Sequence, residues 1–150
     1  IQALMEQYDI PPSRVVIDED GVGGGVVDEI EGVKGFVNNS KPIPEQGVKR
    51  NYANLKSQCT FKAADYINQE KISVYKEIPE HIKEGLITDI EQYQMKDPDK
   101  DGKLAILTKD AIKQNIGRSP DYGDAFMMRM FFELTQDEWM VFEDPTGTIF

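Results

Sequence analysis

Two pairs of aspartates, far apart in the sequence, have the chemistry and the placement to bind divalent metal ions. Asp18 and Asp20 follow a short apolar run, and Asp121 and Asp124 open a second apolar segment. Magnesium and manganese prefer carboxylate oxygens, and two such ions about 3.5–4 Å apart can hydrolyse a phosphodiester. The pattern predicts a metal site assembled by folding. Its alternative is that Asp20 belongs to a simple turn and that Asp121 or Asp124 is a helix-start acid favoured by the helix dipole.

Other kinds of site have less support in the sequence. Glycines cluster between positions 21 and 25, but Val26 and Asp28 stand where a dinucleotide-binding GxGxxG motif needs glycine. The turn over 97–103 copies the first half of a calcium-binding EF-hand loop, yet Thr108 stands where the loop requires a bidentate glutamate. A solvated turn is the favoured interpretation of 97–103, and a metal-free nucleotide site is not expected at the glycines.

Nucleophilic catalysis by histidine or cysteine is not indicated either. The one histidine, His81, lies at a charged helix start, and the one cysteine, Cys59, lies in a different helical segment. We expect His81 at the surface and Cys59 as a small buried hydrophobic residue. A single cysteine also excludes an intramolecular disulfide framework, which favours a reducing, cytoplasmic setting.

The aspartates must be positioned by strands that alternate with helices. Hydrophobic periodicity and turn residues predict strands at 14–17, 33–37 and 103–107. They predict helices at 1–8, 22–30, 52–69, 80–95, 109–116 and 121–134, and leave 72–75 as a strand or an extended connector. This order predicts an α/β fold with helices packed on a sheet. Asp18 would then end a strand and Asp124 begin a helix.

Length and charge limit the possible functions. The 150 residues suit one domain, and the chain contains no apolar stretch long enough to span a membrane and no signal peptide. A net charge of -10 opposes binding to phosphate. The segment 31–76, however, has eight basic and four acidic residues, so a basic face remains possible on an acidic protein.

Several motifs, in order along the chain, resemble one known family. They are Ile17-Asp18-Glu19-Asp20-Gly21-Val22-Gly23-Gly24-Gly25-Val26-Val27-Asp28, then Phe36 with Asn38 and Ser40, then Lys109, then Gly117-Arg118-Ser119-Pro120-Asp121-Tyr122-Gly123-Asp124-Ala125. Over about 14–132 the chain resembles the carboxy-terminal nuclease domain of tailed-bacteriophage terminase large subunits. The resemblance implies a ribonuclease-H-like layered sheet flanked by helices, two magnesium or manganese ions, and endonucleolytic cutting of concatemeric viral DNA.

The resemblance also implies roles for particular residues. Asp18, Asp121 and Asp124 would be catalytic, and these three together with Asp20 would hold the metals. The basic segment 34–62 would contact the backbone of double-stranded DNA, and the candidate contact residues are Lys41, Lys49, Arg50 and Lys109. For Lys109 a solvated helix-start lysine is the alternative. Cutting is expected to show little sequence specificity.

The chain departs from the family pattern in two ways. The family's first catalytic aspartate lies on a strand upstream of the Asp18 strand, and nothing before Arg14 has the pattern of such a strand. The Walker-type ATPase motor is also absent. We therefore expect a single nuclease-like domain over 1–150, a fragment lacking its first strands.

The expected partners are the ATPase domain, the small subunit and the portal, in the host cell cytoplasm. Two alternatives remain, a junction-resolving nuclease of the same broad fold and a non-catalytic packaging or assembly domain.

Overall fold

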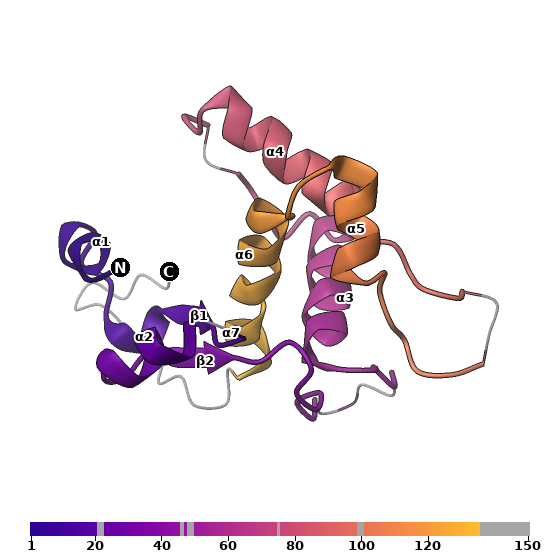
Figure 1. The fold of residues 1–150 in the computed structure, drawn as a ribbon, viewed down its shortest axis with the longest axis horizontal. Helices are drawn as coiled ribbons and strands as arrows, with labels where there is room; N and C mark the ends of the chain where they lie inside the picture. The colour runs from indigo at the N-terminus through magenta and orange to yellow at the C-terminus, as the bar shows by residue number, and fades with distance from the viewer. Residues whose placement is uncertain (21–22, 46, 48–49, 75, 99–100, 136–150) are drawn as a thin grey trace.

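The computed structural model describes residues 1–20, 23–45, 47, 50–74, 76–98 and 101–135, and it combines helices with a small sheet (Figure 1). The elements in chain order are α1 (Gln2–Gln7), the 3₁₀ helix η1 (Pro12–Arg14), β1 (Val16–Asp18), α2 (Gly23–Glu29), β2 (Lys34–Phe36), α3 (Leu55–Asn68), α4 (Glu80–Glu91), α5 (Lys109–Ile116), α6 (Asp121–Arg129) and α7 (Phe131–Leu134). None of the helices within these described ranges has the length and apolar character needed to cross a membrane.

The sheet is a β-α-β unit whose two strands run parallel. Val16 pairs with Lys34 and Asp18 with Phe36, and α2 forms the crossover between the strands. Helix α2 begins so close to β1 that a Cβ atom on Gly23 would lie 1.7 Å from the carbonyl oxygen of Asp18. Only glycine fits there. Because the strands are parallel, the residues after Asp18 and after Phe36 emerge at the same edge of the sheet.

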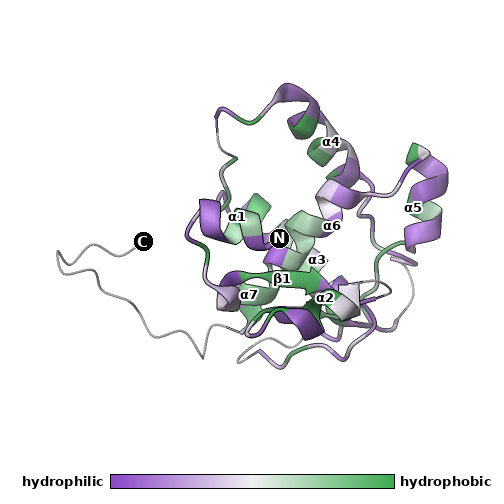
Figure 2. Ribbon diagram, turned by 60° about the vertical axis from the view of Figure 1, so that its left-hand side comes forward, coloured by the Kyte–Doolittle hydropathy of each residue, from purple (hydrophilic) through white to green (hydrophobic). Residues whose placement is uncertain are grey.

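The hydrophobic core lies between β2 and the helices α3, α6 and α7. Its buried members are Phe36, Leu55, Cys59, Ala63, Met127, Met130 and Leu134. The Phe36 ring meets Phe131 edge to face at 6.0 Å between centroids. Figure 2 shows β1 as a hydrophobic strand and α5 as a largely hydrophilic helix. Helix α6 contacts α3, α4 and β1, so it joins the sheet to the helical part of the molecule.

Helices α4 and α6 approach each other at two glycines. A Cβ atom on Gly85 would lie 2.7 Å from the Tyr122 ring, and one on Gly123 would lie 2.8 Å from the Cβ of Asp89. Side chains larger than hydrogen would therefore separate the two helices. The contact fixes the position of the first turn of α6, which carries Asp121 and Asp124.

The loop between β2 and α3 is fixed to α3 by one buried side chain. The Ile43 N–H donates to Gln58 Oε1 at 2.7 Å, and Gln58 Nε2 donates back to the Ile43 carbonyl at 2.7 Å. Gln58 Nε2 also donates to Glu45, which pairs with Lys62 at 2.6 Å. Gln58 is 2% exposed, so this loop is held from inside the molecule.

Much of the predicted element pattern is confirmed. The structure contains both strands at 14–17 and 33–37 and a helix within every predicted helical segment, with 109–116 matching fully. Asn54 caps α3 by accepting from the Ser57 N–H, and Thr108 caps α5 by accepting from the Ala111 N–H. The α/β class is confirmed, whereas the ribonuclease-H-like layering stays a prediction because the described sheet has two strands.

Some boundaries differ from the prediction. The predicted strand at 103–107 is wrong: Leu104 and Ile106 form isolated bridges to Tyr52 and Met95 on opposite sides. The backbone N–H and C=O groups of this segment therefore form hydrogen bonds with loop residues and not with a neighbouring strand of the sheet. The predicted helix at 121–134 divides at Met130, and α4 ends at Glu91 rather than 95. The residues 72–74 form a connector. Residues 99 and 100 of the predicted turn lie outside the described residues.

Cys59 is fully buried in α3, as predicted, and burial raises the pKa of its thiol to about 12. Only the thiolate reacts rapidly with alkylating reagents. We expect iodoacetamide in mildly alkaline buffer to modify the folded protein at least about 100-fold more slowly than the chain in denaturant. Mass spectrometry of the Cys59 peptide measures this. Equal rates in the two states would contradict the burial.

His81, also as predicted, is exposed near the start of α4.

Candidate functional site

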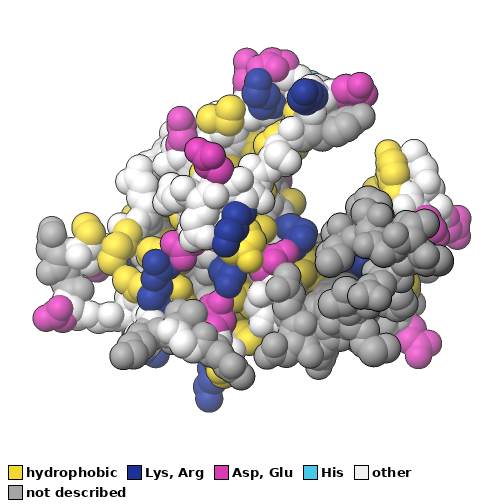
Figure 3. Space-filling view, turned by 180° about the vertical axis from the view of Figure 1, so that it is seen from behind, with side chains coloured by type: hydrophobic (Ala, Val, Ile, Leu, Met, Phe, Trp, Pro, Cys, Tyr) yellow, Lys and Arg dark blue, Asp and Glu magenta, His cyan; other side chains and the backbone are white. Residues whose placement is uncertain are grey.

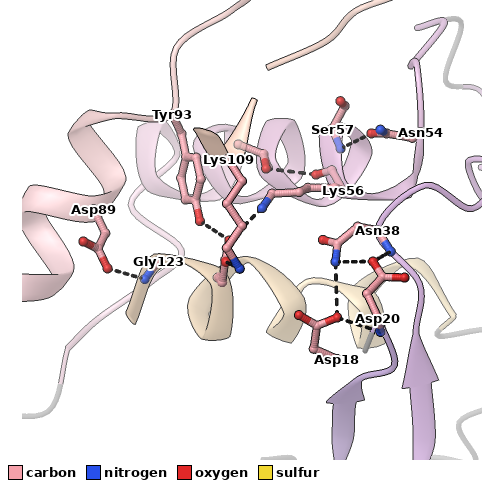
Figure 4. Close-up of polar contacts among 12 residues, drawn as sticks. Asp18, Asp20, Asn38, Asn54, Lys56, Ser57, Asp89, Tyr93, Lys109 and Gly123 are labelled. Carbon is pink, nitrogen blue, oxygen red and sulfur yellow. Dashed lines mark hydrogen bonds and ion pairs between the residues drawn. The ribbon is translucent and has the colours of Figure 1, made fainter. Parts of the chain in front are cut away.

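The first group of the candidate site lies beyond the carboxyl ends of β1 and β2. Asp18 ends β1, and the Asn38 amide lies between the carboxylates of Asp18 and Asp20 (Figure 4). Asn38 Nδ2 donates to Asp20 Oδ2 at 2.7 Å and to Asp18 Oδ1 at 3.2 Å, and the Asn38 N–H donates to Asp20 Oδ2 at 3.1 Å. The Asp20 N–H donates to Asp18 Oδ1 at 3.2 Å. One amide thus bridges two carboxylates, of which Asp18 is half-buried and Asp20 exposed.

The second group surrounds Asp124 in the first turn of α6. Lys56 Nζ of α3 lies 2.8 Å from Asp124 Oδ1, and the hydroxyl of Tyr93, just after α4, donates to the same oxygen at 2.8 Å. Lys109 Nζ, at the start of α5, lies 3.0 Å from Asp124 Oδ2. Figure 4 shows Lys56, Tyr93 and Lys109 converging from three different segments. Asp124 itself is 8% exposed.

These contacts determine the protonation of the group. Burial alone would raise the pKa of Asp124, but the hydrogen bond and charge of Lys56, with the hydrogen bonds of Lys109 and Tyr93, hold that pKa below its ordinary value. Burial and the nearby Asp124 charge raise the pKa of Tyr93 far above its ordinary value. Burial alone would lower the pKa of Lys109, but its hydrogen bond to Asp124 and the Asp124 charge raise that pKa above its ordinary value. At neutral pH Asp124 is therefore a carboxylate, Lys109 an ammonium group and Tyr93 a neutral phenol.

The two groups are neighbours. The charge of Lys109 is acted on not only by Asp124 but also by Asp18 and Asp121, and α6 contacts β1. Asp121 is exposed one turn before Asp124. The aspartates that the sequence places far apart thus lie on neighbouring elements, and their joining in one metal site stays a prediction.

A buried ion pair anchors the helix that carries Asp124. Asp89 of α4 is 0% exposed and accepts from the Gly123 N–H at 3.0 Å through Oδ2. Its Oδ1 lies 2.7 Å from Arg118 NH2. Among buried side-chain atoms of the described residues, Asp89 Oδ1 is the one that makes no hydrogen bond, so the Arg118 charge is its compensation. Arg118 also donates to the Ser119 carbonyl at 2.8 Å.

Some of the carboxylates at the site are suited to bind a hard divalent cation, and one is not. Asp18 and Asp20 present two carboxylates and face one amide, and oxygen ligands of this kind suit magnesium or manganese. Both oxygens of Asp124, in contrast, accept from Lys56, Tyr93 or Lys109. No group of three or more His, Cys, Asp or Glu side chains within the described part of the chain is arranged to hold a metal ion. Asp124 could join Asp18 only after exchanging one of its present partners.

The predicted DNA-contact residues differ in their surroundings. Lys41 is exposed in the loop after β2, whereas Arg50 pairs with Asp65 at 2.5 Å and Lys109 pairs with Asp124. Lys49 lies outside the described residues. In Figure 3, Lys and Arg side chains are interspersed with Asp and Glu on the visible face. A contact between DNA and Lys41 stays a prediction.

Sequence reasoning gave no role beside the aspartates to Asn38, Lys56 or Tyr93, although Asn38 belonged to the motifs of the resemblance and Lys56 to the basic segment 34–62. A signal for Asn38 was present, because Asp20 stands two residues after β1 and Asn38 stands two residues after the parallel strand β2. For Lys56 and Tyr93 no such signal exists. A lysine in the first turn of a helix and a tyrosine at a helix end are ordinary surface patterns, and only the packing of α3 and α4 on α6 makes them neighbours of Asp124.

The fold is similar to a solved structure, the nuclease domain of the large terminase subunit gp2 of bacterial virus Sf6. The two structures superpose with a TM-score of 0.66 and 24% sequence identity, over 85% of this chain and 68% of that chain. No protein-family model and no curated protein matches the sequence. At this identity the likeness establishes the fold. The resemblance found in the sequence motifs is thus confirmed at the level of the fold, which is that of a phage terminase nuclease domain.

Proposed function

We propose that this chain is a metal-dependent endonuclease domain of the viral DNA-packaging type. The observation that carries the proposal is the contact of α6 with β1, which makes the elements of the two distant acidic motifs neighbours within a fold similar to a terminase nuclease domain. Acidic residues at the end of a strand and at the start of a helix are each held by a rigid element. Such placement suits a site that must orient charged groups around a phosphodiester.

The metals of the proposed site are two magnesium or manganese ions. Asp18 and Asp20 would hold a metal on the strand side, and Asp124 with Asp121 on the helix side. Bound there, the ions would activate a water molecule and neutralise charge at the phosphorus. The chain's own contribution is to fix the carboxylates: Asn38 bridges the strand-side pair, and Tyr93 with Lys56 holds Asp124.

The substrate of the proposed activity is concatemeric double-stranded DNA, cut with little sequence preference. Lys41 is the candidate for phosphate contact, because it is exposed in the loop that follows Asn38. The ATPase domain, the small subunit and the portal are the proposed partners, in the cytoplasm of the host cell.

Plasmid nicking tests the proposal. Supercoiled plasmid should be nicked in the presence of Mn²⁺ or Mg²⁺ and not with excess EDTA. Asp18→Asn should lower the rate by about 100-fold or more, because a group that acts on the charge of the transition state is lost. Asp28→Asn, on the exposed side of α2, makes the same charge change away from the site and should leave the rate within about twofold. Equal nicking by Asp18→Asn and Asp28→Asn would reject Asp18 as a metal ligand.

One observation favours the non-catalytic assembly domain as a second candidate. Both oxygens of Asp124 are already satisfied by protein groups, as in a structural ion-pair cluster. An assembly domain would show no nicking with either metal, and Asp18→Asn would leave its affinity for DNA or partner proteins unchanged. The same plasmid assay, run beside a DNA-binding measurement, separates the two candidates.

A further inference from the structure

An apolar pocket of about 100 Å³ lies where α3, α4 and α6 come together. Ala64 and Ile67 of α3, Ile90 of α4 and Phe126 of α6 form much of its wall. Ala64 and Ile67 are exposed, so the pocket opens at the surface. An enclosed apolar cavity of about 150 Å³ can hold a benzene molecule, so this smaller, open pocket suits an aromatic ring that enters in part.

Apolar surface continues outside the pocket. Ile67 at its rim is 41% exposed, and Ile87, one turn before Ile90 on α4, is 48% exposed. Residues three apart on a helix are neighbours on its surface. Exposed apolar side chains that adjoin one another mark a binding surface, whereas single ones do not. The pocket and its rim are therefore apolar surface that no described residue covers.

The chain itself supplies a segment of suitable chemistry. The described residues end at Thr135, and the sequence continues with the apolar run Trp139-Met140-Val141-Phe142, which acidic residues flank on both sides. Residues 136–150 lie outside the described residues. A tryptophan side chain buries about 150–250 Å² when it packs, so a run of this kind favours an apolar partner.

Helix α7 directs the chain toward the pocket. The Tyr66 hydroxyl of α3 donates to Glu133 Oε2 of α7 at 3.2 Å, and Tyr66 adjoins the rim residue Ile67. The Lys71 ammonium lies 5.5 Å from the centre of the Tyr66 ring and makes no ion pair with a described residue. The chain therefore passes the pocket rim in α7, next to an ammonium group that complements the acidic residues around the apolar run.

The pocket is within reach of Trp139. Met127 lines the pocket, and Leu134 follows it by seven residues in α6 and α7, about 10 Å at the helical rise of 1.5 Å per residue. Trp139 follows Leu134 by five residues, and an extended chain of that length spans up to about 17 Å. So short a tether keeps the ring at high effective concentration near the pocket, which favours this segment over a separate partner.

We propose that the run Trp139-Met140-Val141-Phe142 folds back on α3, α4 and α6, and that the Trp139 ring occupies the pocket. This docking needs no metal and does not depend on the nuclease activity. It meets the candidate site at one residue, because the Tyr93 ring lines the pocket while its hydroxyl donates to Asp124 at 2.8 Å. The docked ring thus packs on the side chain that holds Asp124.

Tryptophan fluorescence of the whole chain tests the docking, because Trp139 is its single tryptophan. The emission maximum should lie at a shorter wavelength in the folded protein than in denaturant. Ala64→Glu places a charge at the mouth of the pocket, and glutamate suits an exposed helical position, so this variant should fold and lose the shift. Ala3→Glu makes the same change at an exposed position of α1 and should keep it. The docking is overturned if the folded protein shows no shift, or if Ala64→Glu keeps it.

Contact quenching locates the ring. Bimane attached to Asn68→Cys, an exposed position one turn after Ala64, should be dimmer than bimane attached to Ala3→Cys, because tryptophan quenches bimane on contact. Cys59 is buried, so the reagent labels the introduced cysteine. Trp139→Phe should abolish the quenching. Equal brightness at the two positions would contradict the docking. Quenching that weakens on dilution would assign the pocket to the segment of a second copy, and would overturn docking within one chain.

Discussion

Replacing Asp124 with asparagine should lower metal-dependent nicking by about 100-fold or more and should also destabilise the protein by about 3–5 kcal/mol. Nicking falls because the helix-side carboxylate of the proposed site is lost. Stability falls because Lys56, whose side chain is 12% exposed, keeps its charge beside a neutral amide. Nicking is measured on supercoiled plasmid, and the free energy of unfolding by urea denaturation at neutral pH.

A second substitution separates these two effects. Lys56→Met in the Asp124→Asn background removes the buried charge and retains most of the side-chain volume, so it should recover about half or more of the lost stability. It should not recover nicking, because the carboxylate is still missing. A stable double variant that nicks like the unaltered protein would reject a role for Asp124 in the reaction.

Replacing Arg118 with methionine is the second change with a large expected effect. It should cost about 3–5 kcal/mol, since it leaves Asp89 fully buried with its Oδ1 uncompensated. Asp89→Asn should cost less, about 1–2 kcal/mol. The amide can still accept from the Gly123 N–H, and the remaining Arg118 is 41% exposed and can be solvated. Urea denaturation of both single variants measures the difference between their losses in the free energy of unfolding.

The double variant Arg118→Met/Asp89→Asn completes the cycle. It should be more stable than Arg118→Met alone, because it removes the uncompensated carboxylate. Equal costs for the two single variants, with additive effects in the double variant, would show that Arg118 and Asp89 do not compensate each other. Since Gly123 lies one residue before Asp124, the Arg118→Met variant should also lose part of its metal affinity.

The strand-side part of the site was predictable because its signals are local. Asp18 and Asp20 follow an apolar run and precede glycines, and a parallel pair of strands brings equivalent positions to one edge. The helix-side acids were predictable for a similar reason, since Pro120 and the acids after it are typical of a helix start. What joins the two parts is the packing of α6 on β1, α3 and α4, and this depends on contacts between residues far apart in the sequence.

Helix α4 shows why the remainder could not be predicted. Apolar periodicity predicts a stripe on this helix that consists of Ile82, Leu86, Ile87, Ile90 and Tyr93. Of these, Ile87 is 48% exposed. The face that meets α6 carries Gly85 and Asp89, which the stripe does not include, together with its last member, Tyr93, which follows the helix. Small and polar residues at helical spacing are the usual pattern of a solvated face. They form a buried face here because glycines permit close approach and Arg118 compensates the carboxylate.

The attachment of the loop after β2 to Gln58 has a consequence for binding. Gln58 pairs with both the N–H and the carbonyl of Ile43, as a neighbouring strand would. The chain from Asn38 to Ile43 therefore loses its conformational freedom when the protein folds, not when a ligand arrives. Lys41 lies on this segment, so a phosphate that meets it would find a preorganised contact, with little further entropy lost on association.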